Sequence, residues 1–234
     1  MRVVRRGMGL VSSFLLSYGP QVIKRRVWDK RFSTGQWNFI DHTVGDCVYP
    51  VLERYARSGS ILDLGCGPGN TATELAAHVY HSYVGVDISE EALAKAAART
   101  EASARKEKNR FVCGDFLAYV PTEQFDIILF RESMYHVPLG RVKTTLDRYS
   151  PCLKEGGVFI VRLFAASRET DKSKSRPTAM LGILETEFNV VEKLQSAEPG
   201  RPTVVVLRPK SAAAKDLKPD GLGSREAPPA LSHR

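Results

Sequence analysis

Three glycines occupy alternating positions, 65, 67 and 69, in the stretch LDLGCGPGN. They follow the short apolar run ILDL at 61–64, which is typical of a strand. Because glycine lacks a Cβ and loses much backbone freedom on folding, it is favoured where the backbone turns sharply or where another molecule lies against it. A strand that leads through such a turn into a helix-forming stretch predicts a ligand site at the carboxyl end of a parallel strand.

The spacing of these glycines separates the classes of nucleotide-binding turn. The dinucleotide fingerprint is G-x-G-x-x-G, and the phosphate-binding P-loop is G-x-x-x-x-G-K-[ST]. This chain has G-x-G-x-G, and Asn70 follows the third glycine where a P-loop would have lysine. The turn therefore fits neither class.

The rest of the chain alternates between strand-like and helix-like segments, which predicts an α/β fold. We expect strands at 61–64, 83–87, 110–115, 125–130, 156–164, 189–195 and 203–208, and helices at 71–79, 89–106, 140–150 and 179–187. Ser89 is the expected N-cap of the second of these helices. The sheet should be mostly parallel with helices on both faces. The connection SAEPGRP is too short for a helix, so the last two strands should form an antiparallel hairpin.

Charge and cysteine content narrow the function further. The net charge is +8, but residues 1–31 hold eight Lys or Arg against one acid, and the span 32–208 is close to neutral. A neutral body argues against a broad nucleic-acid-binding face. The four cysteines are scattered without a C-x-x-C pair, so we expect reduced thiols, a cytoplasmic location and no metal site.

Two acidic motifs follow the glycine turn. GVD ends the second expected strand at Asp87, and CGDF follows the third at 113–116. A carboxylate at the end of the second strand can accept hydrogen bonds from both hydroxyls of a ribose. With LDLGCGPGN, these motifs resemble the class I S-adenosylmethionine-dependent methyltransferases over about residues 58–208. The resemblance implies a Rossmann-like, seven-stranded, mostly parallel sheet with the antiparallel hairpin at its end.

The resemblance also divides the chain and assigns a cofactor site. Residues 1–57 would be a basic, aromatic arm with lid helices, 58–208 the methyltransferase domain, and 209–234 a disordered tail. The family pattern places Asp63 near the methionine amino group, Gly65, Cys66, Gly67 and Gly69 beneath the cofactor, Asp87 at the ribose, Ile88 and Phe116 beside the adenine, Asp115 at the adenine amino group, and Arg131 at the methionine end.

Each assignment has a structural alternative. The glycines could be ordinary turn residues, and Asp87 could be a surface carboxylate at a strand end. Asp115 could cap the segment that follows it, and Arg131 could pair with a nearby acid such as Glu132. The sequence alone does not decide between these structural alternatives and the cofactor-binding roles.

The segment RESMYHVP at 131–138 follows the fourth strand, where methyl donor and acceptor should meet. The cofactor would bring an activated methyl group, so the protein mainly positions an acceptor atom, with a general base where that atom is a hydroxyl oxygen. His136 is the first candidate for the base because its ordinary pKa lies near neutrality. Glu132 and Tyr135 are further candidates. Alternatively, His136 packs or orients the loop.

The acceptor should be recognised by segments outside the sheet. The stretch at 27–42 is rich in aromatic residues, and Trp28, Phe32 and Trp37 are expected to line the acceptor pocket. They could instead fasten a helix to the core. The loop at 165–177 is a second candidate. Without room for a large inserted domain, we expect a small or medium-sized acceptor, such as a secondary metabolite, a sugar or a lipid-linked molecule, methylated on oxygen or nitrogen.

The first 20 residues combine a basic start with a short apolar stretch. They resemble a signal peptide, but no A-x-A-like site follows. A basic helix of this kind could contact an anionic membrane peripherally, or could pack across the cofactor cleft. Two other functions also remain: an RNA or protein methyltransferase on the same scaffold, and a non-catalytic partner subunit that binds the cofactor.

Overall fold

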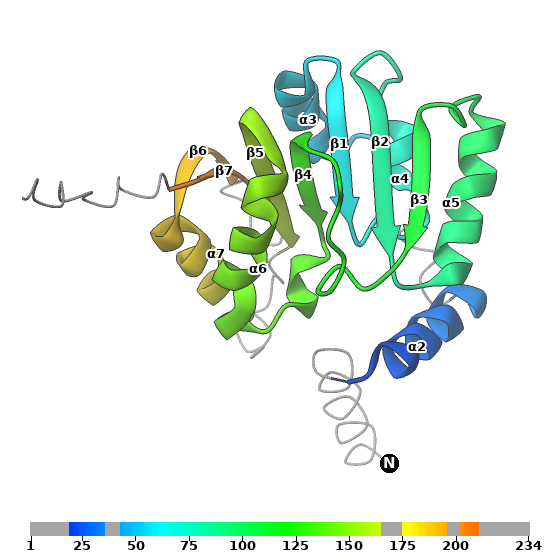
Figure 1. Cartoon of the computed structure of the whole chain (residues 1–234), viewed down its shortest axis with the longest axis horizontal. Coiled ribbons are helices and arrows are strands. Elements are labelled where there is room, and N and C mark those ends of the chain that lie inside the picture. Colours follow the sequence, from blue (N-terminus) through cyan, green and yellow to red (C-terminus); the bar gives the residue numbers. More distant parts are fainter. Residues whose placement is uncertain (1–18, 36–42, 165–174, 196–201, 211–234) are drawn as a thin grey trace, which may run out of the picture.

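The computed structural model describes residues 19–35, 43–164, 175–195 and 202–210. Seven strands form one sheet in the order β3-β2-β1-β4-β5-β7-β6 (Figure 1). The strands are β1 Gly59–Leu64, β2 Tyr80–Asp87, β3 Asn109–Cys113, β4 Phe125–Arg131, β5 Leu153–Phe164, β6 Phe188–Gln195 and β7 Pro202–Pro209. The first five pair in parallel, whereas β7 runs antiparallel to both β5 and β6. The predicted Rossmann-like sheet and its antiparallel hairpin are confirmed.

Six α-helices accompany the sheet in the described part of the chain. They are α2 Gln21–Ser33, α3 Val48–Ala56, α4 Asn70–Glu74, α5 Glu90–Ala102, α6 Val142–Tyr149 and α7 Ser175–Glu187. In Figure 1, α6 and α7 lie on one face of the sheet, α3 and α4 lie on the other, and α5 runs beside β3. Helices on both faces were expected, because a mostly parallel sheet buries both of its faces.

Alternate residues of the central strands build two separate cores. Leu62 and Leu64 of β1 pack in the cluster that includes α6 and α7. Ile61, whose side chain points to the other face, packs in the cluster that includes α3. The same division holds for β4, where Ile128 and Ile127 belong to opposite clusters. Successive side chains of a strand point to opposite faces of the sheet. Because both faces are covered, these strands are apolar at consecutive positions.

The helix expected at 71–79 is wrong in length, because α4 ends at Glu74 and Leu75 has an extended backbone. Leu75 itself is buried. The carbonyl oxygen of Ala72 accepts hydrogen bonds from the Tyr80 hydroxyl of β2 and from the side chain of Asn109 in β3, 37 residues further along the chain. Tertiary contacts therefore end a segment whose composition favours a longer helix.

Ser89 is confirmed as the N-cap of α5, since its side chain accepts a hydrogen bond from the Ala92 backbone N–H. The helix is shorter than expected and stops at Ala102, because Ala104 takes a left-handed conformation with φ of 55°.

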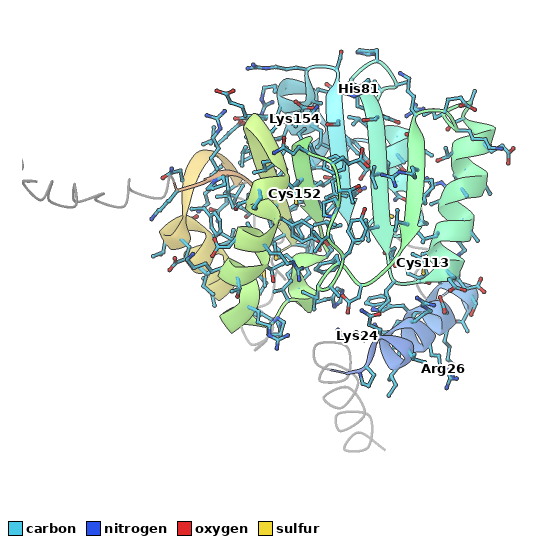
Figure 2. All side chains as sticks on the ribbon, viewed as in Figure 1. Lys24, Arg26, His81, Cys113, Cys152 and Lys154 are labelled. Carbon is cyan, nitrogen blue, oxygen red and sulfur yellow. The ribbon has the colours of Figure 1, made fainter. Side chains whose placement is uncertain are left out.

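The helix α2 lies at the edge of the sheet where the parallel strands end, next to α5 (Figure 1). Lys24 is buried on the side of α2 that faces the sheet, and Arg26 is exposed on the outer side (Figure 2). None of the described helices is both long and apolar enough to cross a bilayer. The predictions for residues 1–18, for Trp37 and for most of the tail lie outside the described residues, and the domain boundaries stay predictions.

Candidate active site

The glycine turn after β1 adopts backbone conformations that side chains rarely permit. Gly65, Gly67 and Gly69 have φ of 81°, 53° and 76°. At Gly65 a Cβ would lie 2.5 Å from the Cβ of Ser133, so the loop after β4 approaches the turn too closely for any side chain. At Gly67 the nearest neighbour of such a Cβ would be Phe32 at 3.8 Å. The turn therefore requires glycine for its own path and leaves the surface above Gly67 open.

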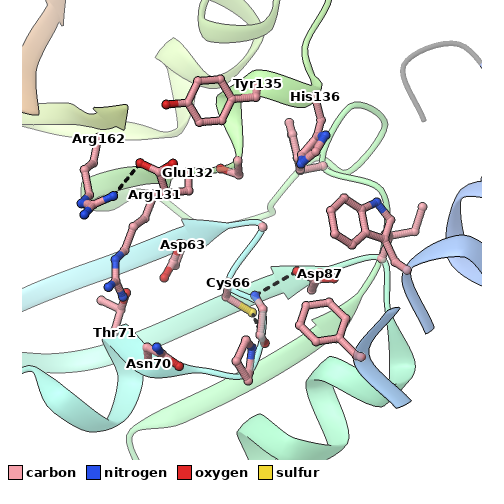
Figure 3. A pocket seen from close by; sticks show the side chains of 18 of the residues that line it. Asp63, Cys66, Asn70, Thr71, Asp87, Arg131, Glu132, Tyr135, His136 and Arg162 are labelled. Carbon is pink, nitrogen blue, oxygen red and sulfur yellow. Dashed lines mark hydrogen bonds and ion pairs between the residues drawn. The ribbon is translucent and has the colours of Figure 1, made fainter. Parts of the chain in front are cut away.

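A cavity of about 610 Å³ opens above this turn, at the carboxyl ends of the parallel strands (Figure 3). Its volume lies within the range of small-molecule sites. The predicted residues that line it are Trp28, Phe32, Asp63, Gly65, Cys66, Gly67, Asp87, Ile88, Asp115, Phe116, Arg131, Glu132, Tyr135 and His136. Gly69 does not line it; a Cβ there would lie 2.8 Å from Ala96 of α5, so this glycine permits helix packing.

Asp87, at the end of β2, joins the glycine turn to the start of α5. Its Oδ2 accepts a hydrogen bond from the Gly67 N–H at 2.9 Å, and its Oδ1 accepts one from the Ser89 N–H at 2.9 Å. Burial raises the pKa of this carboxyl to about 6, against the opposing effect of the two N–H groups. The Asp87 carboxylate therefore lies in the cavity wall and is fixed by two backbone hydrogen bonds. It is not a free surface side chain at a strand end.

Asp63 lies in β1, 1% exposed. Its Oδ2 accepts a hydrogen bond from the Tyr83 hydroxyl at 2.7 Å, and burial raises its pKa to about 6. Within the described residues its Oδ1 has no hydrogen-bond partner, and neither has the buried hydroxyl of Ser133. Buried polar atoms without partners are uncommon, so two of them at one cavity indicate that a ligand completes the hydrogen bonding.

Arg131 pairs with an acid, as one alternative suggested, but the acid is Asp46 at 3.0 Å and not the neighbouring Glu132. Asp46 also accepts a hydrogen bond from Nε of Arg162, a β5 residue, at 2.9 Å. Arg162 in turn donates to Glu132 at 2.5 Å (Figure 3). Each buried guanidinium thus has a carboxylate partner because β4 and β5 lie side by side and both end at the segment before α3.

Glu132 has a left-handed backbone, with φ of 57°, which is uncommon for a residue with a side chain. Its N–H donates to the Arg162 carbonyl oxygen at 3.1 Å, which holds the turn in place. Burial raises the pKa of its carboxyl, although Arg162 opposes the shift. The strained turn directs a carboxylate of raised basicity into the cavity, as is common at functional sites.

Tyr135 lines the cavity, but its hydroxyl is bound to backbone, because it donates to the Phe164 carbonyl oxygen at 2.6 Å. Burial lowers the pKa of His136 to about 4, and the nearby cation Arg31 adds to the shift. The rings of His136 and Trp28 pack edge to face, with their centroids 4.9 Å apart. His136 is therefore neutral at neutral pH and packed against α2.

Asp115 has the capping role considered for it and a second partner that the sequence did not indicate. Its Oδ1 caps the turn after β3 by accepting from the Leu117 N–H at 2.9 Å, and its Oδ2 accepts from Lys24 of α2 at 2.9 Å. The carboxylate still lines the cavity.

The sequence alone missed three charged residues of this site, namely Lys24, Asp46 and Arg162. Arg162 offered a signal, because it interrupts the apolar run GGVFIVRLF in a buried strand. Lys24 is hidden in a basic run, and nothing local distinguishes Asp46.

Residues 61–157, from β1 to the first part of β5, match a family model described as a methyltransferase domain. The chain contains a class I methyltransferase domain. This domain resembles part of a sterol 24-C-methyltransferase of Gibberella zeae, with 33% identity over 124 residues, which is 52% of this chain and 30% of that protein. It also resembles a trans-aconitate 2-methyltransferase of Streptomyces avermitilis, with 35% identity over 110 residues, 45% of this chain and 40% of that protein. The chain spans less than half the length of these relatives.

The methyltransferase domain shares its fold with solved structures as well. The N-methyltransferase NodS of Bradyrhizobium japonicum, crystallised with S-adenosyl-L-homocysteine, superposes with a TM-score of 0.62. The two chains are 20% identical, and the match covers 79% of this chain and 97% of that one.

Proposed function

We propose that this chain transfers a methyl group from S-adenosylmethionine to an oxygen or nitrogen atom of a small or medium-sized acceptor. One observation supports this most: the glycine turn lies between two carboxylates, the buried Asp63 and the half-buried Asp87, in the wall of a single cavity. Asp63 keeps an oxygen without a partner among the described residues, and Asp87 is fixed by two backbone N–H groups.

The two carboxylates fit the adenosyl cofactor. A carboxylate oxygen has two lone pairs, so each oxygen of Asp87 can accept a ribose hydroxyl besides the backbone N–H it already binds. The open Oδ1 of Asp63 suits the ammonium of the methionine end. NodS, which shares this fold, was crystallised with S-adenosyl-L-homocysteine, and this agrees with the choice of cofactor.

When bound, the sulfonium supplies an activated methyl group and a neutral leaving group. The protein itself must then position the acceptor and remove its proton. Among the candidate bases, Tyr135 is committed to backbone, and His136, with a pKa of about 4, is a weak base at neutral pH. Burial instead makes Glu132 more basic than usual. We therefore assign proton removal to Glu132 and orientation of the acceptor to His136.

The cavity volume of about 610 Å³ favours a small acceptor over a macromolecule. The names of two relatives point to a sterol and to trans-aconitate, which are both small molecules. Trp28 and Phe32 of α2 line the cavity and would cover such an acceptor. Whether it is a secondary metabolite, a sugar or a lipid-linked molecule stays open in this proposal, as does peripheral contact of the basic arm with an anionic membrane.

Isothermal titration with S-adenosylmethionine and S-adenosylhomocysteine tests the proposal. The purified protein should bind both, and Asp87→Ala should weaken binding by about 100-fold or more, because it removes a charged acceptor of two hydrogen bonds. Asp147→Ala, at a half-exposed site of α6, is the matched control and should bind normally. Circular dichroism establishes that both variants fold. Absence of binding by the wild type, or full binding by Asp87→Ala, would contradict the proposal.

A further inference from the structure

The segment 43–49, which leads into α3 and forms its start, borders the cavity. The Thr43 carbonyl oxygen accepts a hydrogen bond from the Asp46 N–H at 3.0 Å, and both residues line the cavity. Arg131 donates from Nη2 to Asp46 at 3.0 Å and from Nη1 to the Tyr49 hydroxyl at 3.2 Å. The position of the Arg131 guanidinium in the cavity wall therefore depends on this segment.

Glu74, the last residue of α4, holds the 43–49 segment. Its Oε1 accepts from the Thr43 N–H at 3.1 Å, and its Oε2 accepts from the hydroxyls of Thr43 and Tyr49 at 2.7 and 2.8 Å. Arg99 of α5 lies 3.5 Å from Oε1, and the Glu74 side chain is 8% exposed. A carboxylate has about four lone-pair sites, so these contacts occupy it. Glu74 itself does not line the cavity.

Glu74 stays ionised although it is buried. Burial raises the pKa of its carboxyl, but the hydrogen bonds from Thr43 and Tyr49 and the charge of Arg131 outweigh this effect, and the pKa lies below its ordinary value. Hydrogen bonds to an ionised acceptor are about twice as strong as those between neutral groups. The attachment of the 43–49 segment to α4 is therefore firm.

The other end of α4 binds the same segment. Asn70, the first residue of this five-residue helix, follows the glycine turn and donates from Nδ2 to the Thr43 hydroxyl oxygen at 3.1 Å. Asn70 lies at the same end of the cavity as Arg131 (Figure 3). A continuous hydrogen-bond network thus runs from the glycine turn through Thr43 and Tyr49 to Arg131.

We propose that Glu74 is a positioning residue for the methionine end of the cofactor: through Thr43 and Tyr49 it fixes the cavity wall against which the amino-acid part lies. This inference rests on the proposed function, in which Asp63 binds the ammonium of that part. The effect of Glu74 should be confined to the methionine end, because the carboxylate for the ribose, Asp87, is held by separate backbone contacts.

The test compares S-adenosylhomocysteine with 5′-methylthioadenosine, which has the same nucleoside and thioether but lacks the amino-acid end. Titration calorimetry on the full chain measures both affinities. Glu74→Gln keeps the side-chain volume but turns an N–H₂ group toward donors, so it should weaken binding of S-adenosylhomocysteine by about tenfold. Binding of methylthioadenosine should change by less than about twofold, since this ligand lacks the part that the 43–49 segment would contact.

Tyr49→Phe tests the same path at a second point. It removes the hydroxyl that joins Glu74 to Arg131 but keeps the ring, whose centroid lies 5.3 Å from the guanidinium carbon of Arg131. The same selective loss of S-adenosylhomocysteine binding is expected. This variant decides the question if Glu74→Gln does not fold.

Glu192→Gln is the matched control. The Glu192 carboxylate, on β6, also holds α3, because it accepts from the Tyr55 hydroxyl at 2.9 Å and pairs with Arg54, but it does not line the cavity. Both affinities should stay at their wild-type values in this control.

Four results would overturn the inference. The variants Glu74→Gln and Tyr49→Phe bind S-adenosylhomocysteine as tightly as the wild type, they weaken both ligands equally, Glu192→Gln shows the same selective loss, or the wild type binds the two ligands equally well. A wild type that binds neither ligand would instead refute the proposed function.

Discussion

Asp46 should be one of the most sensitive positions in the chain. Its side chain is 4% exposed and neutralises two buried guanidiniums, accepting from Arg131 at 3.0 Å and from Arg162 at 2.9 Å. It also accepts from the Val48 N–H at 3.0 Å at the start of α3. The substitution Asp46→Asn keeps the volume, removes the charge, and turns an amide N–H₂ toward one of the guanidiniums.

The magnitude follows from the burial of the partners, which are 11% and 14% exposed. Removing one member of a buried pair leaves an uncompensated charge and costs about 3–5 kcal/mol. Because Arg162 keeps Glu132 as a second partner, we expect the lower end of this range. For a chain of this size the loss corresponds to a fall in Tm of about 6–12 °C.

The pH dependence of this loss gives a second measure. Burial would raise the pKa of Asp46, but Arg131 and Arg162 outweigh it and hold the pKa below the ordinary value. A carboxylate whose pKa is lower in the folded state stabilises the fold above its unfolded pKa, and this stabilisation disappears as the pH falls through the folded pKa. The difference between wild type and Asp46→Asn should therefore be full at neutral pH and shrink below about pH 4.

Thermal unfolding followed by circular dichroism measures both effects. The control is Asp147→Asn, which breaks the exposed pair between Lys143 and Asp147 and should change the free energy of unfolding by less than about 0.5 kcal/mol. A Tm for Asp46→Asn within about 2 °C of the wild type would refute the reasoning that these buried charges depend on Asp46.

Two further predictions concern the turn and the histidine. Gly65→Ala places a Cβ 2.5 Å from Ser133 in a backbone of positive φ and should lower the free energy of unfolding by about 1–3 kcal/mol in urea titrations, whereas Gly140→Ala, with open space around it, should be nearly neutral. Equal stability of the two variants would argue against the close approach. Burial lowers the pKa of His136 to about 4, so between about pH 4 and 6.5 only the unfolded chain binds this proton, and stability falls as the pH is lowered. His136→Gln should remove that part of the acid sensitivity, up to about 1.4 kcal/mol per pH unit, and parallel stability curves of variant and wild type would contradict the assignment.

The sequence by itself determined the features that depend on neighbouring residues. Apolar, strand-like segments that alternate with helix-like segments predict the strands of the sheet. Ser89, followed by acidic residues, predicts the start of α5. The glycines of LDLGCGPGN predict a turn of positive φ, which Gly65 and Gly67 adopt. In each case the preference is local, because it arises from backbone sterics, side-chain period or a cap a few residues away.

Only the tertiary structure decided which charges meet at the cavity. Lys24 and Asp115 are 91 residues apart, and Asp46 is 85 residues from Arg131 and 116 from Arg162. The same holds for the end of α4, where the Ala72 carbonyl oxygen is bound by side chains that arrive from other elements. No local pattern encodes such pairs, because a charge in a sequence can meet many partners and only the packed sheet and α2 bring one of them within reach.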